Sequence, residues 1–287
     1  MNIYDYLGKS LKNKRLAKES FTFQFLYECW LQHLIERAMR LFVLNTDPVP
    51  SKEVVFCLLL NGTCGVTDKY KGMLGAYNGY YCGTPTIYYD MYEDYAVHSP
   101  VYADVLKVDK DVIVIDNNAC RTSIYPIAHR YATMLAHTEV SIVNTLVNGR
   151  DSGGIPIAST EAQKQAIQNY RNSLFNGKVT SILDPAFSGV KFAGVSKNTA
   201  LSVGELMELR TNLLSSYYND LGVKTSKEKK GNMIVEEVNA NESMLLLNIS
   251  DMLHSWELGF DKVNDKYGTE WTVELAPELN YVDKDVI

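Results

Sequence analysis

The feature that most limits how this chain can fold is a long helical run with almost no charge. Residues 126–146 carry apolar side chains at helical spacing, with Pro126 at the start and Gly149 just past the end. Pro is favoured in a first helical turn and Gly after the last one, so the run predicts a helix of about 30 Å. Arg130 and Glu139 are its only formally charged residues. Because helices with so few charges usually lie between neighbours, we expect other helices or other subunits to cover it.

Two further helical runs flank a strongly charged segment. The runs cover 201–221 and 242–267, and a Gly follows each of them. The chain between them carries a basic cluster and then an acidic pair, formed by Lys227, Lys229, Lys230, Glu236 and Glu237. Such a segment is costly to bury and exceeds the usual length of a helix–helix connection. We therefore predict a loop over 223–241 that faces water or a polyanion.

The chain begins with a basic arm, residues 1–19. Its basic residues, set against only Asp5 and Glu19, are Lys9, Lys12, Lys14, Arg15 and Lys18. The simple interpretation is a solvated terminus. The sharper one is an electrostatic contact with a nucleic acid or with an acidic partner.

A predicted helix over 21–43 leads into a β-rich region that extends to residue 116. Pro48 ends the helix, because proline disfavours helix both at its own position and at the one before it. Short apolar runs then alternate with Gly- and Asn-Gly turns, and these runs are 54–60, 86–89, 103–108 and 112–116. The pattern predicts a small antiparallel sheet or barrel. The region has no phosphate-binding glycine motif, which disfavours nucleotide binding.

Residues 150–198 form a compact insertion between the helical runs 126–146 and 201–221. The predicted elements are a strand at 155–158, a helix at 160–175 and strands at 178–183 and 189–195. Fewer than fifty residues make a poor independent core. We therefore expect copies of the same segment in neighbouring subunits to complete it. A last short strand is predicted at 269–275.

The composition excludes several functional classes. A net charge of −6 argues against a generally basic nucleic-acid-binding protein, so any phosphate contact must come from local clusters. The five cysteines form no CxxC pair and are expected to be free thiols in a reducing compartment. The five histidines are scattered, and no hydrolase or metal-binding motif is present. We expect a soluble protein made in a cytoplasm, with no enzymatic activity, no metal and no cofactor.

The order of these elements resembles that of the portal proteins of small short-tailed bacteriophages with protein-primed linear genomes. These proteins are also called upper collar proteins or head–tail connectors. The stretches that carry the resemblance are 99–102, 112–118, 213–223 with 227–230 and 235–239, and 260–268. Residue matches are strongest in the last third of the chain.

The resemblance implies an α+β, portal-like subunit, twelve copies of which form a ring around a channel. It implies long stem helices, an SH3-like β module in the wing and a small α/β clip. The implied divisions are an arm at 1–19, wing at 20–125, stem at 126–149, clip at 150–198, stem at 199–222, channel loop at 223–241 and wing at 242–287.

The resemblance also implies partners for the basic residues. A channel that bound phosphates tightly would stall DNA, so only local lysines are expected to touch it. The DNA-contacting candidates are Lys191, Lys197, Lys227, Lys229 and Lys230. The candidates for contact with a packaging RNA or motor are Lys12, Lys14, Arg15 and Lys18. Further implied partners are capsid and scaffolding proteins, a lower collar or tail protein and a packaging ATPase, with no membrane. The protein would be assembled in the host cytoplasm and lie at the portal vertex of the virion.

Two alternatives remain open at this point. One is a nucleic-acid-processing enzyme with an atypical site in the Gly- and Tyr-rich module, which nuclease or ATPase activity would favour. The other is a different collar or tail subunit without a DNA channel, whose ring would lack a narrow waist.

Overall fold

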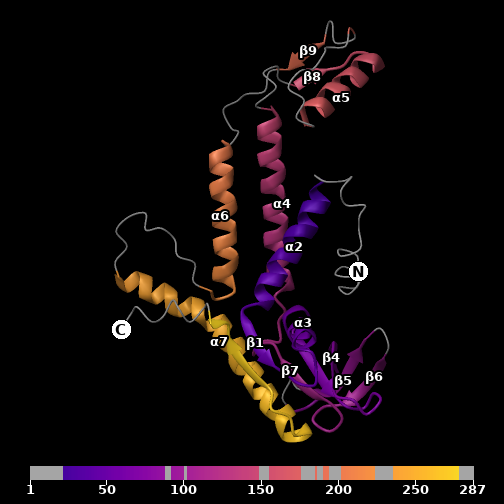
Figure 1. The fold of residues 1–287 in the computed structure, drawn as a ribbon, viewed down its shortest axis with the longest axis vertical. Helices are drawn as coiled ribbons and strands as arrows, with labels where there is room; N and C mark the ends of the chain where they lie inside the picture. The colour runs from indigo at the N-terminus through magenta and orange to yellow at the C-terminus, as the bar shows by residue number, and fades with distance from the viewer. Residues whose placement is uncertain are drawn as a thin grey trace. The chain divides into compact units, whose positions relative to one another are not determined.

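The computed structural model describes residues 22–87, 92–99, 102–148, 155–175, 185, 190–193, 202–223 and 235–277. Its residues fall into two compact units. One unit contains the described residues of 28–133 and 214–277, and the other contains those of 22–27 and 134–213. Three of the described helices have residues in both units, and the remaining described elements each belong to one. Figure 1 labels helices and strands along the chain.

The elements confirm the predicted α+β class. The first unit holds most of α2 (Phe23–Met39), then β1 (Phe42–Asn45), α3 (Ser51–Asn61), β2 (Thr63–Thr67), β3 (Gly75–Tyr77), β4 (Gly79–Pro85), β5 (Tyr92–His98), β6 (Ala103–Lys107), β7 (Ile113–Asp116), α7 (Val235–Tyr267) and β10 (Thr272–Leu275). Both units share α4 (Tyr125–Asn148) and α6 (Val203–Asp220). The second unit alone holds β8 (Ile155–Ile157), α5 (Glu161–Phe175) and β9 (Lys191–Ala193).

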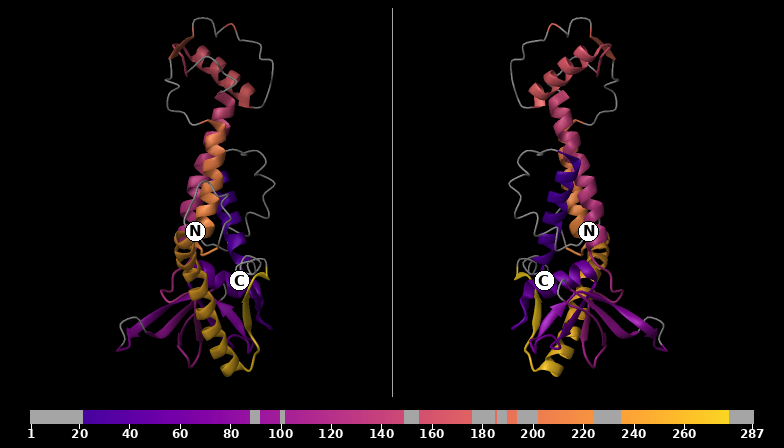
Figure 2. Two further views of the ribbon diagram at one scale, coloured as in Figure 1. Left: turned by 90° about the vertical axis from the view of Figure 1, so that its left-hand side faces the viewer. Right: turned by 90° about the vertical axis from the view of Figure 1, so that its right-hand side faces the viewer.

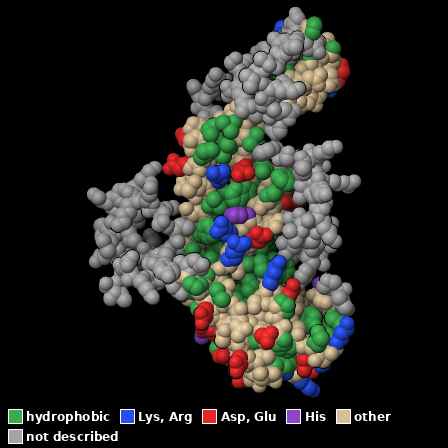
Figure 3. All heavy atoms as spheres, viewed as in Figure 1, with side chains coloured by type: hydrophobic (Ala, Val, Ile, Leu, Met, Phe, Trp, Pro, Cys, Tyr) green, Lys and Arg blue, Asp and Glu red, His purple; other side chains and the backbone are tan. Residues whose placement is uncertain are grey.

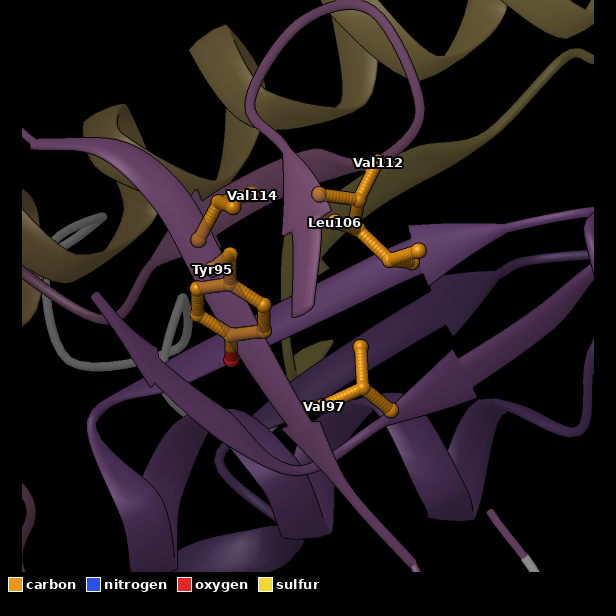
Figure 4. Packing of buried hydrophobic residues seen from close by; sticks show 5 residues of the cluster. All are labelled: Tyr95, Val97, Leu106, Val112 and Val114. Atoms are coloured by element: carbon orange, nitrogen blue, oxygen red, sulfur yellow. The ribbon is translucent and has the colours of Figure 1, made fainter. Parts of the chain in front are cut away.

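The predicted antiparallel β module consists of two three-stranded sheets. Their strand orders are β3-β2-β7 and β4-β5-β6, and every pairing within them is antiparallel. Figure 4 shows side chains from both sheets pointing toward one another, with Tyr95 and Val97 from β5, Leu106 from β6 and Val112 and Val114 from the β7 segment. The two sheets therefore share one apolar core.

The apolar run at 54–60 is a helix, so its prediction as part of the sheet is wrong. It lies inside α3, and all seven of its residues are buried. A run buried on every side has no polar face, so neither helical nor strand periodicity can appear in it. Gly62 ends the helix with φ of 85° and donates its N–H to Leu58 O at 2.9 Å. That left-handed glycine is a regular C-terminal signal of helices.

The predicted first helix is also too long, because the chain leaves it before Phe42. Helix α2 ends at Met39, and β1 then pairs antiparallel with β10, with Phe42 opposite Leu275. The Phe42 ring packs on Trp256 of α7 at a centroid distance of 4.3 Å. The strand at Phe42–Asn45 thus depends on partners more than 200 residues away, which local spacing cannot show.

Helix α7 is the longest element, and it begins inside the predicted charged loop. It starts at Val235 instead of Glu242, so residues 235–241 are helical. In Figure 2 it runs along the β1–β10 ribbon, and it also contacts β7. Asn264 fastens its end to the chain that follows, because its Oδ1 accepts the N–H of Trp271 at 2.7 Å and its Nδ2 donates to Trp271 O at 3.0 Å. The predicted closing strand at 269–275 is confirmed as β10, Thr272–Leu275.

In the second unit, the first strand, the helix and the last strand predicted for the insertion are confirmed as β8, α5 and β9. Strands β8 and β9 pair antiparallel, with Ile157 opposite Lys191. Helix α5 starts with a reciprocal cap, in which Thr160 Oγ1 accepts the N–H of Gln163 at 3.2 Å and Gln163 Oε1 accepts the N–H of Ser159 at 2.8 Å. The predicted strand at 178–183 lies outside the described residues.

Candidate functional site

The candidate functional site is the pair of helices α4 and α6, which contact each other in both units. In the first unit, an ion pair joins Arg130 of α4 to Asp220 at the end of α6. The same carboxylate oxygen accepts the Tyr131 hydroxyl at 2.9 Å, and the Asp220 carbonyl accepts Nδ2 of Asn248 at 2.9 Å. Asp220 therefore ties α4, α6 and α7 together at one point.

In the second unit, a further ion pair joins the same two helices. Arg210 Nη1 of α6 lies 3.7 Å from Glu139 Oε1 of α4. Arg130 and Glu139, the two formally charged residues of the helical run 126–146, thus each form an ion pair with a residue of α6. Partly exposed ion pairs contribute little to stability. Their value here lies in setting how the two helices align.

Tyr217 anchors α6 inside the first unit. Its ring is fully buried and packs edge-on against Tyr131 at 5.6 Å, and its hydroxyl donates to Leu34 O of α2 at 2.8 Å. Burial raises the pKa of Tyr217 far above its usual value. The hydroxyl therefore stays protonated and remains a donor at all ordinary pH values.

Apolar side chains remain exposed on both helices. Ala132, Ala136 and Leu135 of α4 are buried, but Leu146 of α4 and Met207 and Leu209 of α6 are exposed. Figure 3 shows hydrophobic side chains at the surface over these two helices. These three side chains are 39–48% exposed, and contact with another protein chain would cover them.

Comparison with known proteins identifies the kind of protein that carries these helices. A family model described as Phage Connector (GP10) matches residues 60–280, more than three quarters of the chain. The chain belongs to this family. The resemblance to portal and connector proteins is thereby confirmed, and it places this connector among the structural components of the virion that join head and tail in an oligomeric ring.

The chain was also compared with solved structures and with curated proteins. A solved structure entitled "Portal and tail of native bacteriophage P68" aligns with the connector at 16% sequence identity and a TM-score of 0.42, covering 99% of this chain and 95% of that one. No curated protein matches the sequence. Neither alternative considered for the sequence, an enzyme or a collar subunit of another kind, gains support from the family match.

Only one of the connector's predicted contact residues lies among the described residues. Lys191 is exposed in β9, opposite Ile157. The remaining candidates, whose positions lie outside the described residues, are Lys12, Lys14, Arg15, Lys18, Lys197, Lys227, Lys229 and Lys230. The structure therefore brings no two of these residues together, and their roles stay predictions.

A second charged cluster was not predicted from the sequence. Asp116, at the end of β7, accepts the Tyr81 hydroxyl at 3.1 Å and Nε of Arg121 at 3.2 Å. The Arg121 guanidinium also lies over the Tyr81 ring, 4.5 Å from its centroid. Burial raises the pKa of Asp116, and Arg121 opposes that rise. The cluster fixes the chain where it leaves the β module, just before α4, and has no local sequence signal beyond two nearby opposite charges.

Three further observations concern the cysteines, metal binding and membrane-spanning helices. All five cysteines are free, and Cys57 and Cys64 are fully buried. Among the described residues, no group of three histidine, cysteine or acidic side chains could hold a metal ion. No helix in the described ranges has both the length and the apolar character needed to cross a membrane.

Proposed function

We propose that this connector forms a twelve-membered ring around a channel through which double-stranded DNA enters and leaves the phage head. The observation that carries the proposal is the family match, which spans the whole of α4, α6 and α7. The apolar side chains that stay exposed on α4 and α6 support it, because a head-to-tail ring would cover them with a neighbouring copy.

The same proposal assigns partners to the parts of the chain. The segment 150–198 would be the clip, α4 and α6 the stem, and 20–125 with 242–287 the wing. The ring would contact capsid, scaffolding and lower collar or tail proteins and dock a separate packaging ATPase. The arm residues Lys12, Lys14, Arg15 and Lys18 would bind the motor or a packaging RNA through phosphates.

Negative-stain microscopy of the purified protein tests the ring directly. We expect particles with a central hole and a countable rotational symmetry, because exposed apolar helix surface favours association with further copies. Twelvefold symmetry with a narrow waist in side view is the expected result. A monodisperse monomer, or rings without a central hole, would contradict the proposal.

We further propose that Lys227, Lys229 and Lys230 touch the DNA in the channel. Replacing all three with glutamine is expected to leave ring assembly unchanged and to reduce the fraction of phage heads that keep their packaged genome. Each lost phosphate contact removes one counterion-release term from DNA binding. The measurement is the amount of nuclease-resistant DNA in purified heads, alongside ring images of the same variant.

The matched control removes three positive charges from the β-module side of the chain. Lys52, Lys71 and Lys110 are exposed, and changing them to glutamine alters the net charge equally. Heads made with this control variant should retain DNA normally. Normal retention by the Lys227, Lys229 and Lys230 variant, or equal loss in the control, would remove the case for a channel contact. The clip lysines, Lys191 and Lys197, can be tested in the same way.

A further inference from the structure

Among the strands that the structure describes, β6 lies at an unpaired edge of the sheet β4-β5-β6. An edge strand presents backbone N–H and C=O groups that a strand from another chain can join. In a protein that assembles from many identical copies, such an edge offers an unwanted route of association.

The hydrogen bonds at the two ends of the β5–β6 ladder show which groups point outward. Val108 N donates to Glu93 O at 3.0 Å, and Ser99 N donates to Tyr102 O at 2.8 Å. Hydrogen-bonded and non-hydrogen-bonded residue pairs alternate along an antiparallel ladder. The residues of β6 whose backbone groups point away from β5 are therefore Ala103, Val105 and Lys107.

Two of these three outward N–H groups are occupied by carboxylates. Val105 N donates to Asp104 Oδ1 at 2.8 Å. Lys107 N donates to Asp111 Oδ2 at 3.2 Å. An incoming strand would have to displace both carboxylates before it could accept these hydrogen bonds.

Asp111 is held in place from several sides. Lys69 Nζ lies 3.1 Å from Asp111 Oδ1, and Thr67 Oγ1 donates to Asp111 O at 2.7 Å. The chain also folds back on the edge, because Asp111 N and Val112 N both donate to Lys107 O, at 2.8 Å and 3.2 Å. Hydrogen bonding to Lys69, and then to the Lys107 N–H, lowers the pKa of Asp111, so its side chain is an ionised acceptor at neutral pH.

The neighbouring sheet surface makes such protection necessary. Tyr80, Ala96 and Val105 form one row across the three strands. Tyr80 is 64% exposed and Val105 is 58% exposed. An exposed apolar row beside a free edge has the character of segments that add strands and aggregate.

We propose that Asp104 and Asp111 close the edge of β6 against strand addition by a second copy of this chain. The two carboxylates act as hydrogen-bond acceptors for Val105 N–H and Lys107 N–H, and their negative charge is secondary. Assembly of the connector is thereby directed to surfaces other than this sheet edge.

The test compares two double variants that remove the same two charges. Asp104→Ala with Asp111→Ala removes the acceptors, whereas Asp104→Asn with Asp111→Asn keeps a side-chain oxygen at each position. We expect the alanine pair to associate beyond the native particle at a protein concentration about tenfold lower than the asparagine pair, as two freed backbone hydrogen bonds would allow. Light scattering against concentration measures this, and circular dichroism checks that both variants are folded.

Two further variants keep the test decisive. Asp104→Ala alone should show part of the effect, and adding Val105→Pro should abolish it, because proline has no N–H to offer and is tolerated on edge strands. Equal association of the alanine and asparagine pairs would show that charge alone matters and would overturn the proposal. Association that persists in the Asp104→Ala, Val105→Pro variant would also overturn it, because a route other than the edge would then be responsible.

Discussion

Replacing Trp256 with alanine is expected to lower the free energy of unfolding by about 3–5 kcal/mol. The side chain is fully buried, and its ring packs on Phe42 at a centroid distance of 4.3 Å. Its indole N–H donates to Asn117 O at 3.1 Å and lies 3.2 Å from Asn117 Oδ1. The change would therefore leave a cavity and remove the donor that these two buried oxygens face. Urea unfolding at a fixed protein concentration measures the loss, because assembly makes apparent stability depend on concentration.

Two companion variants separate the causes of the Trp256 effect. Leu258→Ala lies on the same helix at a side chain that is 52% exposed, and it should change stability by less than about 0.5 kcal/mol. Trp256→Phe keeps much of the ring but loses the N–H, so an intermediate loss is expected. If Leu258→Ala and Trp256→Ala were equally destabilising, the central role of Trp256 in joining β1, α7 and the turn at 117 would be wrong.

Gly259→Ala is expected to destabilise the protein by about 1–3 kcal/mol, although alanine is the better helix former. At Gly259, α7 packs tightly against β7, and a Cβ there would lie 2.5 Å from Ile115 Cγ2. The Ile115 side chain is itself fully buried, so it has little freedom to move aside. Either the helix must shift from the sheet or the isoleucine must leave its rotamer.

Gly204→Ala provides the matched control for this prediction. Gly204 also lies in a helix, α6, and the atom nearest to a Cβ there is Ser202 Oγ at 3.8 Å. This variant should be neutral or stabilised by up to about 1 kcal/mol. Adding Ile115→Ala to Gly259→Ala should recover part of the loss if crowding is the cause. A stabilised Gly259→Ala variant would show that α7 does not pack on β7 as closely as described.

The long helices could be predicted from the sequence because their signals are local. The run at 126–146 has proline at its start and glycine past its end, and α4 covers Tyr125–Asn148. The run at 201–221 corresponds in the same way to α6, Val203–Asp220. In both, apolar periodicity and end signals agree, so the limits were found to within two residues.

The errors arose where distant partners or complete burial decide the structure. The apolar run in α3 has no polar face, and Phe42 becomes a strand residue only because β10 lies beside it. At the start of α7, the acidic pair Glu236-Glu237 and the asparagines that follow outnumber the apolar residues, and this polar character favoured the prediction of a loop. The tight packing of Gly259 on Ile115 joins two segments far apart in the sequence, so single-residue patterns contain no trace of it.

The same contrast between local sequence signals and distant partners applies to the candidate site. Charge clusters identify basic residues such as Lys227 or Lys14 but do not show what lies near them, so these contacts remain proposals. The ion pairs of Asp220 and Arg210 could not be predicted from the sequence, because a charged residue in a helix gives no sign of its partner on another helix. The family resemblance, which depends on the order of many elements, was the strongest inference available from the sequence.

In one of the two ion pairs the arginine lies on α4, and in the other it lies on α6, and this arrangement favours one relative orientation of the two helices. Arg130 and Glu139 are nine residues apart on α4, and their partners Asp220 and Arg210 follow in reverse order on α6. A parallel alignment of the same helices would place arginine beside arginine and acid beside acid. Like charges at such distances repel in partly exposed positions. These four side chains thus favour the antiparallel orientation. Exchanging the arginine and the acid of one pair would leave two acids on one helix and two arginines on the other, a pattern that pairs opposite charges in both orientations and no longer distinguishes them.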